Sequence, residues 1–199
     1  MSVNTFDQFL QDITITDHQR TVIVPARRSA VVENLSASFS SNSDMPFMES
    51  HLIGSAAKGT IVRPIDDVDV LATFSNANNV WESKYANDSQ AFLYRIRNAY
   101  DGCVTSQVGA RGQAIRVFFQ TGGHVDVAPV FTQAGDGQSF YLPDGAGGWL
   151  LTSPFVANSW FTTRNADLSY NLGPVVRLLK KWNIAHSKRL RSFHLETMT

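Results

Sequence analysis

The sequence predicts an α+β protein, in which helices at both ends of the chain enclose a central block of strands that forms a mixed sheet. Apolar residues recur at helical spacing near the start of the chain, at Val24, Val31 and Leu35, and helical spacing returns after Leu168. The middle of the chain instead carries runs of β-branched and aromatic residues, such as 115–119. The 199 residues suffice for one domain, or one and a half domains, with a sizeable core.

In the N-terminal half, two helices are expected before the first strand. Pro25 should kink or interrupt the second helix, because proline lacks the backbone N–H that a helix interior needs. A serine-rich loop, a strand, a short helix and a buried strand should follow in that order. The expected bounds are Asn4–Asp12 and Asp17–Phe39 for the two helices, Ser36–Ser43 for the loop, Phe47–Ile53 and Val68–Phe74 for the strands, and Ala56–Thr60 for the short helix.

In the C-terminal half, an amphipathic helix should precede a β-hairpin, and two more helices should follow. Gly122-Gly123 separates two β-type runs, which is the pattern of a hairpin turn. The glycine-rich segment after the hairpin is expected to be a linker or a mobile loop. The expected bounds are Ser89–Tyr100, Gln113–Phe131 for the hairpin, Gln133–Gly148 for the loop, and Phe155–Thr163 and Leu168–Ile184 for the helices, with a core domain at 1–150 and the beginning of a helical lobe at 151–199.

Composition and charge argue against several classes of function. Lys and Arg number 17 and so do Asp and Glu, which weighs against a protein that binds nucleic acid by charge alone, although 180–191 is locally basic. No apolar run reaches the ~18 residues of a membrane helix, and the N-terminus lacks the pattern of a secretory signal. The one cysteine, Cys103, allows neither an intramolecular disulfide nor a cysteine metal cluster. We therefore expect a cytoplasmic protein without a membrane partner.

The most informative stretch combines a Gly-Ser pair with two aspartates. Apolar residues precede Gly54-Ser55, a spacer follows, and Asp67 and Asp69 then alternate with apolar residues. Because side chains alternate along a strand, the two aspartates share one face, where their charges repel unless cations lie between them. Carboxylate oxygens suit Mg²⁺, which usually carries a substrate phosphate, and backbone N–H groups at Gly54-Ser55 can cradle that phosphate. The alternative is a strand end with two solvated carboxylates and a turn glycine.

A third aspartate, Asp126, lies on the second strand of the predicted hairpin. Three carboxylates on neighbouring strands can hold two metal ions ~3.5–4 Å apart, the separation used for an in-line displacement at phosphorus. His124 shares a face with Asp126, and we interpret it as a strand histidine whose hydrogen bonds are satisfied. Taken alone, Asp126 could instead be a turn carboxylate at a strand end.

The ordered pattern of Gly-Ser, spacer and alternating aspartates resembles the signature of the polymerase-β-like nucleotidyltransferase superfamily. More narrowly, it resembles the bacterial cGAS/DncV-like nucleotidyltransferases (CD-NTases), which are relatives of the animal cyclic GMP-AMP synthase and the oligoadenylate synthases. The resemblance implies a polymerase-β-like nucleotidyltransferase core with a mixed sheet, followed by the start of a helical lobe. It covers the chain from about Met48 and is carried by Gly54–Thr60, Arg63-Pro64, Asp67–Val70, Tyr141–Gly145, Gly147–Trp149, Val176–Asn183 and Ser192–Glu196.

The resemblance also implies a role for each candidate residue. Asp67 and Asp69 would bind both of two Mg²⁺ or Mn²⁺ ions, and Asp126 would bind one of them and help deprotonate the attacking hydroxyl. The triphosphate of an NTP substrate would be held by Gly54, Ser55, Lys180 and Ser192.

Lys180 and Ser192 each have an alternative interpretation. Lys181 competes with Lys180, and because one residue turns a helix by ~100° both cannot serve equally. Lys180 could also be a surface lysine on an amphipathic helix, and Ser192 an ordinary helix N-cap.

The function implied by the resemblance is metal-dependent synthesis of a cyclic di- or trinucleotide, or a linear oligonucleotide, from ATP and other NTPs, as a second messenger in bacterial antiphage signalling. Two alternatives stay open: a nucleotidyltransferase that modifies RNA ends, a protein or a small molecule, and a catalytically weak nucleotide-binding module. Relatives continue beyond the position of Thr199, so 151–199 is expected to be an incomplete lobe with an exposed apolar patch. A missing segment, self-association or an activating protein partner would cover that patch.

Overall fold

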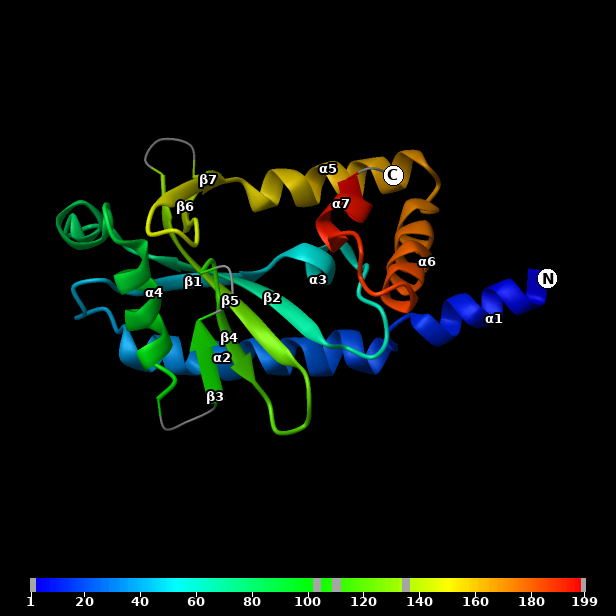
Figure 1. Ribbon diagram of the computed structural model, residues 1–199, viewed down its shortest axis with the longest axis horizontal. Coiled ribbons are helices and arrows are strands. Elements are labelled where there is room, and N and C mark those ends of the chain that lie inside the picture. Colours follow the sequence, from blue (N-terminus) through cyan, green and yellow to red (C-terminus); the bar gives the residue numbers. More distant parts are fainter. Residues whose placement is uncertain (1–2, 102–104, 109–111, 134–136, 198–199) are drawn as a thin grey trace.

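The computed structural model describes residues 3–101, 105–108, 112–133 and 137–197, and Cys103 lies outside these ranges. Helices precede, cover and follow a central sheet, as the α+β prediction requires (Figure 1). The elements in chain order are α1 (Val3–Ile13), η1 (Gln19–Ile23), α2 (Val24–Ser38), β1 (Phe47–Leu52), α3 (Gly54–Lys58), β2 (Asp67–Phe74), η2 (Trp81–Tyr85), α4 (Ser89–Asn98), β3 (Thr105–Val108), β4 (Ile115–Phe118), β5 (His124–Thr132), β6 (Phe140–Pro143), β7 (Trp149–Thr152), α5 (Pro154–Asp167), α6 (Leu172–Ala185) and α7 (Ser192–Thr197).

The described strands form one mixed sheet. Its main order is β1-β2-β5-β4-β3, while β6 pairs with the end of β5 and β7 pairs with β6. Strands β2 and β5 are parallel, and the other neighbours are antiparallel. The long strand β5 can serve two partners on one side because β4 pairs with its first half and β6 with its last residues.

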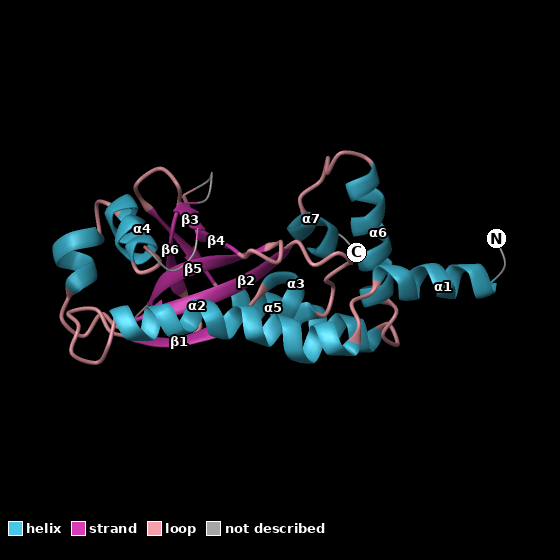
Figure 2. Ribbon diagram, turned by 90° about the horizontal axis from the view of Figure 1, so that it is seen from below, coloured by secondary structure: helices cyan, strands magenta, loops and turns pink. Residues whose placement is uncertain are grey.

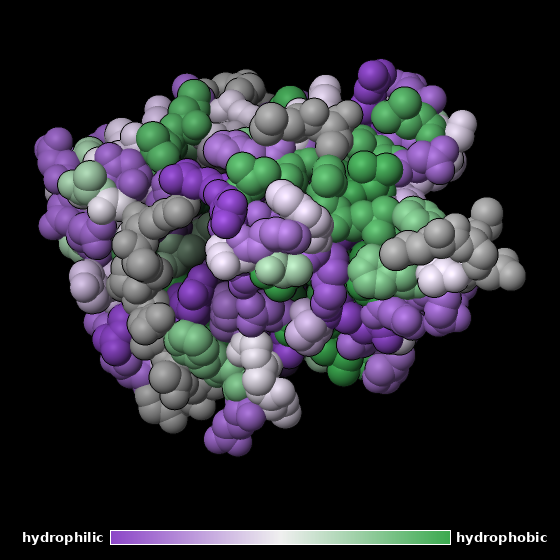
Figure 3. All heavy atoms as spheres, turned by 45° about the vertical axis from the view of Figure 1, so that its right-hand side comes forward, coloured by the Kyte–Doolittle hydropathy of each residue, from purple (hydrophilic) through white to green (hydrophobic). Residues whose placement is uncertain are grey.

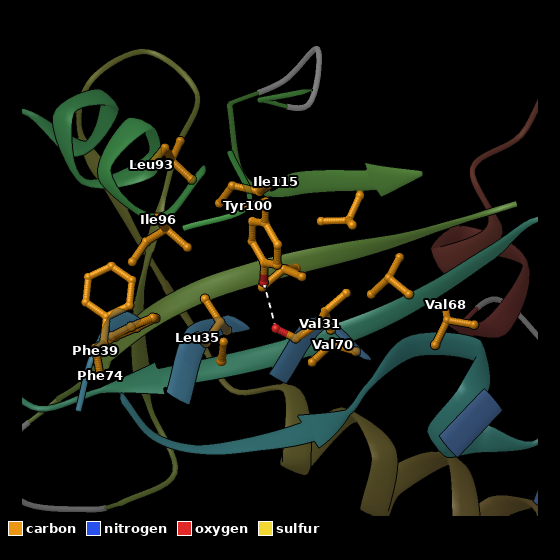
Figure 4. Packing of buried hydrophobic residues seen from close by; sticks show 14 of the residues in the cluster. Val31, Leu35, Phe39, Val68, Val70, Phe74, Leu93, Ile96, Tyr100 and Ile115 are labelled. Atoms are coloured by element: carbon orange, nitrogen blue, oxygen red, sulfur yellow. Dashed lines mark hydrogen bonds between the residues drawn. The ribbon is translucent and has the colours of Figure 1, made fainter. Parts of the chain in front are cut away.

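One face of the sheet packs on α2 and α4 to form the main core. Along β2, the alternate residues Val68, Val70, Ala72 and Phe74 all point into this core. Figure 4 shows side chains from α2, α4 and the strands meeting around Tyr100, whose hydroxyl donates to the Val31 carbonyl oxygen at 3.2 Å. The period of two along β2 therefore fixes which residues remain for the opposite face.

The opposite face of the sheet changes character along its length. Near the ends of β2 and β5, Leu71 and Val130 are buried with Phe140, and Phe155 of α5 packs against them. At the beginning of the same two strands the alternate positions carry aspartates instead of apolar residues. Apolar helix packing thus covers one half of this face and leaves polar residues for the other half.

Most predicted elements are confirmed, and the differences have local causes. Pro25 was expected to kink or interrupt the second helix, but the backbone stays helical on both sides of it: the proline lies in the first turn of α2, directly after the π-helical turn η1, where its missing N–H is tolerated. The segment Gln133–Gly148 was expected to be a loop, and that prediction is wrong, since it contains β6 and leads into β7. Each of these strands has four residues, too few for a clear alternation of apolar and polar side chains. Tertiary contacts hold them in place, such as the stacking of Trp81 on Tyr141 with ring centres 4.8 Å apart. The division of the chain at residue 150 stays a prediction.

The C-terminal helices bury only part of their apolar stripe. Phe161, Leu172 and Val176 are buried together between α5 and α6, whereas Trp160 and Trp182 are 46% and 51% exposed. Helix α1 contacts α6 at this end of the molecule (Figures 1 and 2). Figure 3 shows apolar side chains gathered on the face that includes this end. The predicted exposure of apolar side chains is thus confirmed, and what covers them stays a prediction.

Among the described residues, no helix has both the length and the apolar character to span a membrane.

Candidate active site

Strand β2 presents Asp67 and Asp69 on the face opposite the main core. Their neighbours Val68 and Val70 are fully buried in the core, so the alternation along the strand places both aspartates on the other face. In the parallel pairing of β2 with β5, Asp69 lies opposite Asp126. The predicted placement of three aspartates on adjacent strands is therefore confirmed.

Gly54 brings the first turn of α3 directly against Asp69. The Ile53 backbone N–H donates to the Asp69 carbonyl oxygen at 3.1 Å, which ties the start of α3 to β2. Gly54 has a φ of +58°, a left-handed conformation that favours glycine, and a Cβ at this position would lie 2.4 Å from Asp69 Oδ2. The glycine of the Gly-Ser pair is thus needed both by its backbone conformation and by the aspartate beside it.

The surroundings of Asp69 disfavour the negative charge of its carboxylate. Burial raises the pKa of Asp69 to about 7, with the neighbouring charges of Asp67, Asp126 and Glu196 acting in the same direction and Lys180 opposing them. Both burial and like charges disfavour the ionised carboxylate. A divalent cation beside Asp67 and Asp69 would restore the ionised form, since carboxylate oxygens are the ligands that Mg²⁺ prefers. This pair of side chains therefore fits the predicted metal.

Asp126 is held by an arginine from the adjacent strand. Arg116 pairs with Asp126 in the β4–β5 register, and its Nε and Nη2 each donate to one carboxylate oxygen at 2.8 Å. The hydrogen bonds from Arg116 to Asp126 raise the pKa of Arg116, and the two-pronged contact fixes the orientation of the carboxylate. Within the described ranges, no group of three His, Cys, Asp or Glu side chains is arranged to hold a metal ion. The role of Asp126 as a metal ligand and base stays a prediction.

Asp66 and His124 flank the three aspartates. The His124 backbone N–H donates to the Asp66 carbonyl oxygen at 2.9 Å, and the exposed Asp66 carboxylate lies 3.6 Å from Lys188 Nζ. His124 Nε2 lies 3.7 Å from Asp126 Oδ2 and has no hydrogen-bond partner in the described part of the chain. The expectation of a satisfied strand histidine is therefore wrong at this nitrogen, because 3.7 Å is too long for a hydrogen bond to Asp126.

A cavity of about 330 Å³ opens beside Asp67 and Asp69. Its lining comes from α3, from the segment between α3 and β2, and from α6 and α7. This volume lies at the lower end of the ~300–1,000 Å³ of small-molecule sites. Asp126 is not among the lining residues, but all the other predicted site residues are: Gly54, Ser55, Asp67, Asp69, Lys180 and Ser192.

Lys180, not Lys181, belongs to this cavity. Lys180 is 6% exposed, and its Nζ donates to Glu196 Oε1 at 2.5 Å, to Thr60 Oγ1 at 3.2 Å and to the Thr60 carbonyl oxygen at 3.3 Å. Lys181 Nζ donates elsewhere, to the Arg63 carbonyl oxygen at 3.0 Å. The predicted register of the helix thus agrees with the structure, but the Lys180 ammonium already contacts protein acceptors.

Sequence reasoning missed two charged residues of the cavity, Lys58 and Glu196. Glu196 is 3% exposed, and its Oε2 accepts a hydrogen bond from Lys58 Nζ at 2.7 Å. Burial alone would raise the pKa of Glu196, but Lys180 and Lys58 outweigh burial and hold this pKa below its usual range. Both residues lie within the segments that carry the family resemblance. In each segment a charged residue follows an apolar one, and this was the signal that the sequence offered.

Comparisons with known proteins agree with the geometry. A family model described as the Second Messenger Oligonucleotide or Dinucleotide Synthetase domain matches residues 1–165. A Bacillus cereus (strain VD146) protein named "Probable cyclic nucleotide synthase" is 23% identical, over 98% of this chain and 69% of that protein. The "Cyclic AMP-AMP-AMP synthase" of Escherichia coli (strain MS 115-1) is 28% identical, over 65% of this chain and 40% of that protein.

Solved structures share the fold. The structure of CdnC from E. coli MS115-1 with ATP superposes with a TM-score of 0.71 at 21% identity, covering 98% of this chain and 63% of that chain. The same protein in a complex with HORMA-deltaN gives a TM-score of 0.67 and is covered to 61%. The present chain thus spans less than two thirds of the length of these solved chains.

Proposed function

Because the chain belongs to the family of Second Messenger Oligonucleotide or Dinucleotide Synthetase domains, we propose that it joins NTPs into a cyclic di- or trinucleotide or a linear oligonucleotide. The observation that carries this proposal is a single cavity that contains Asp67 and Asp69 together with Gly54 and several lysines, among them Lys58 and Lys180. Carboxylates suit divalent metal ions, and ammonium groups suit the phosphates of a nucleotide. The names of the two relatives, both cyclic nucleotide synthases, support the same class of reaction.

In the proposed reaction, the 3′ or 2′ hydroxyl oxygen of one nucleotide bonds to the α-phosphorus of another. The bond from that phosphorus to the oxygen of the β-phosphate breaks, and pyrophosphate leaves. The hydroxyl proton passes to a carboxylate, a role that we assign to Asp126, whose orientation Arg116 fixes. Two Mg²⁺ or Mn²⁺ ions, held by Asp67 and Asp69 with Asp126 as a further ligand, would supply positive charge to the reacting phosphate.

The remaining residues of the cavity would position the triphosphate. Gly54 lets the start of α3 approach Asp69 closely, so that the phosphates bound near Ser55 would lie beside the carboxylates. Lysines on α3 and α6 and Ser192 on α7 line the same space from other directions. The NTP would thus be held between the cationic and the acidic side chains, which is the orientation that in-line attack requires.

The proposal extends to the biological role. We assign the product to second-messenger signalling in bacterial antiphage defence, in the cytoplasm, with an activating protein partner or self-association. The complex of E. coli CdnC with HORMA-deltaN supports a protein partner, and the exposed Trp160 and Trp182 offer apolar surface for one.

A synthesis assay tests the proposed reaction. We expect the chain, incubated with the four common NTPs and Mg²⁺ or Mn²⁺, to release pyrophosphate and to form cyclic or linear oligonucleotides detectable by mass spectrometry. EDTA should abolish the product, because removal of the metal ions leaves the carboxylates of Asp67 and Asp69 facing the negatively charged phosphates. Transfer of label to RNA ends, a protein or a small acceptor would favour the modifying enzyme. Nucleotide binding without any product would favour the binding module.

A further inference from the structure

Three helices meet at one buried carboxylate, that of Glu196. Its Oε1 accepts hydrogen bonds from Lys180 Nζ of α6 at 2.5 Å and from Thr60 Oγ1 at 2.8 Å, and its Oε2 accepts from Lys58 Nζ of α3 at 2.7 Å. Two ammonium groups around one carboxylate leave this part of the wall with a net positive charge. Lys58, Lys180 and Glu196 all line the cavity that also contains Asp67.

The two lysines differ in the hydrogen bonds that they have left to give. A lysine ammonium carries three N–H donors. Lys180 has three acceptors within hydrogen-bond distance, which are Glu196 Oε1, Thr60 Oγ1 and the Thr60 carbonyl oxygen. Among the described residues, Lys58 has one acceptor, Glu196 Oε2, and its ammonium otherwise lies 5.8 and 5.6 Å from the ring centres of Phe161 and Phe193. Lys58 therefore keeps donors for a ligand, whereas Lys180 does not.

The place of Lys58 on α3 matches the expected place of the phosphates. Lys58 lies four residues after Gly54 on the same short helix, and residues at this spacing share a helix face. Gly54 contacts Asp69, so the Lys58 ammonium and the acidic side chains border the same cavity. An anionic ligand that approaches these aspartates needs compensating positive charge, and Lys58 can supply it.

We propose that Lys58 contacts the polyphosphate of the bound nucleotide and that Glu196 is the positioning residue that holds its ammonium at the cavity wall. Lys180 then adds its positive charge to the same cavity wall and supports Glu196, which it links to Thr60. The identity of the ligand as a nucleoside triphosphate rests on the proposed function.

The test is a binding experiment with inorganic tripolyphosphate and with ATP, by titration calorimetry on the full chain. Lys58→Met keeps the apolar stem beside Phe161 and removes the donors, so its affinity for both probes should fall by ~10- to 100-fold. The salt dependence of binding should also weaken. Lys181→Met is the matched control, because Lys181 Nζ donates to Arg63 outside the cavity, and its affinity should stay within about twofold of wild type.

A double variant tests whether Glu196 acts through Lys58. Glu196→Gln should also weaken binding, and Lys58→Met combined with Glu196→Gln should bind no more weakly than Lys58→Met alone, because residues that act together are not additive. If Glu196 is purely structural, Glu196→Gln will lower the melting temperature and leave the affinity unchanged, which would overturn the positioning role. Losses of affinity that add up in the double variant would overturn it as well. If the Glu196→Gln chain does not fold, the comparison of Lys58→Met with Lys181→Met decides the contact.

The outcomes separate this inference from the proposed function. Binding of tripolyphosphate that depends on Lys58, in a chain that forms no nucleotide product, would sustain the inference and refute the synthase reaction. Product formation by a chain whose Lys58→Met variant binds tripolyphosphate like wild type would overturn the inference and leave the reaction standing. A wild-type chain that binds neither probe would overturn the inference as well.

Discussion

Asp69→Asn is expected to abolish nucleotide transfer and to leave the fold intact. Asp69 is the middle carboxylate of the site, next to Asp67 on its own strand, opposite Asp126 on β5 and in contact range of Gly54. Asparagine has nearly the same shape but supplies no negative charge to a divalent cation, so we expect a loss of several orders of magnitude in rate. The measurement is product formation from NTPs by mass spectrometry, with circular dichroism to verify folding.

The same substitution should stabilise the chain above neutral pH when metal is removed by a chelator. The pKa of Asp69 is about 7 in the folded chain, through burial and then through neighbouring charges, against ~3.9 in an unfolded chain. The folded state therefore binds this proton more tightly, and stability falls as pH rises from about 4 to about 7. Asparagine has no charge to lose, so the variant should gain on the order of a few kcal/mol over wild type at pH 8 and almost nothing at pH 4.

Asp66→Asn provides the control for this stability profile. Its carboxylate is exposed and lies in the same segment, 3.6 Å from Lys188 Nζ. A surface pair of this kind contributes ~0–1 kcal/mol, so its unfolding curve should follow wild type at every pH. Denaturant unfolding at several pH values gives the comparison. An Asp69→Asn chain that keeps a near-wild-type rate, or whose stability runs parallel to wild type from pH 4 to pH 8, would refute the assignment of Asp69.

The acidic half of the site could be predicted because strand geometry leaves little choice. Val68 and Val70 must enter the core, and a period of two then places Asp67 and Asp69 together on the other face. The position of Arg116 was also within reach, since the register of the hairpin around Gly122-Gly123 places it opposite Asp126. Such local patterns carry over from sequence to structure because each depends on one strand or one turn.

The cationic half of the site could not be predicted in the same way. Glu196 and Lys58 are 138 positions apart, so their ion pair depends on how α7 packs against α3 rather than on any local pattern. A glutamate with 3% exposure also contradicts the usual preference of this residue for the surface. The sequence identified Lys180 through a family resemblance, but only the tertiary structure shows that Glu196 and Thr60 already occupy its donors.

Gly54→Ala is expected to remove most of the activity through a single added methyl group. The new Cβ would lie 2.4 Å from Asp69 Oδ2, too close for any contact, so either the Asp69 carboxylate or the start of α3 must move. A displacement of ~1 Å in a site that aligns reacting groups can cost ~100-fold in rate. The left-handed φ of +58° adds a stability cost of ~1–3 kcal/mol for a residue other than glycine.

Gly59→Ala separates the effect of strain from the effect of the contact. Gly59 ends the same helix with a φ of +67°, so alanine should suffer similar backbone strain there, but a Cβ at this position would meet nothing within 4 Å. Both variants should therefore lose stability in denaturant unfolding, Gly54→Ala more than Gly59→Ala because of its added close contact, while only Gly54→Ala loses its rate of product formation. If both variants stay active, or both lose activity in proportion to stability, the close approach of Gly54 to Asp69 is not what the reaction requires. If only Gly54→Ala fails, the glycine of the Gly-Ser pair serves the carboxylate beside it, and the helix start and the acidic strand act as one unit.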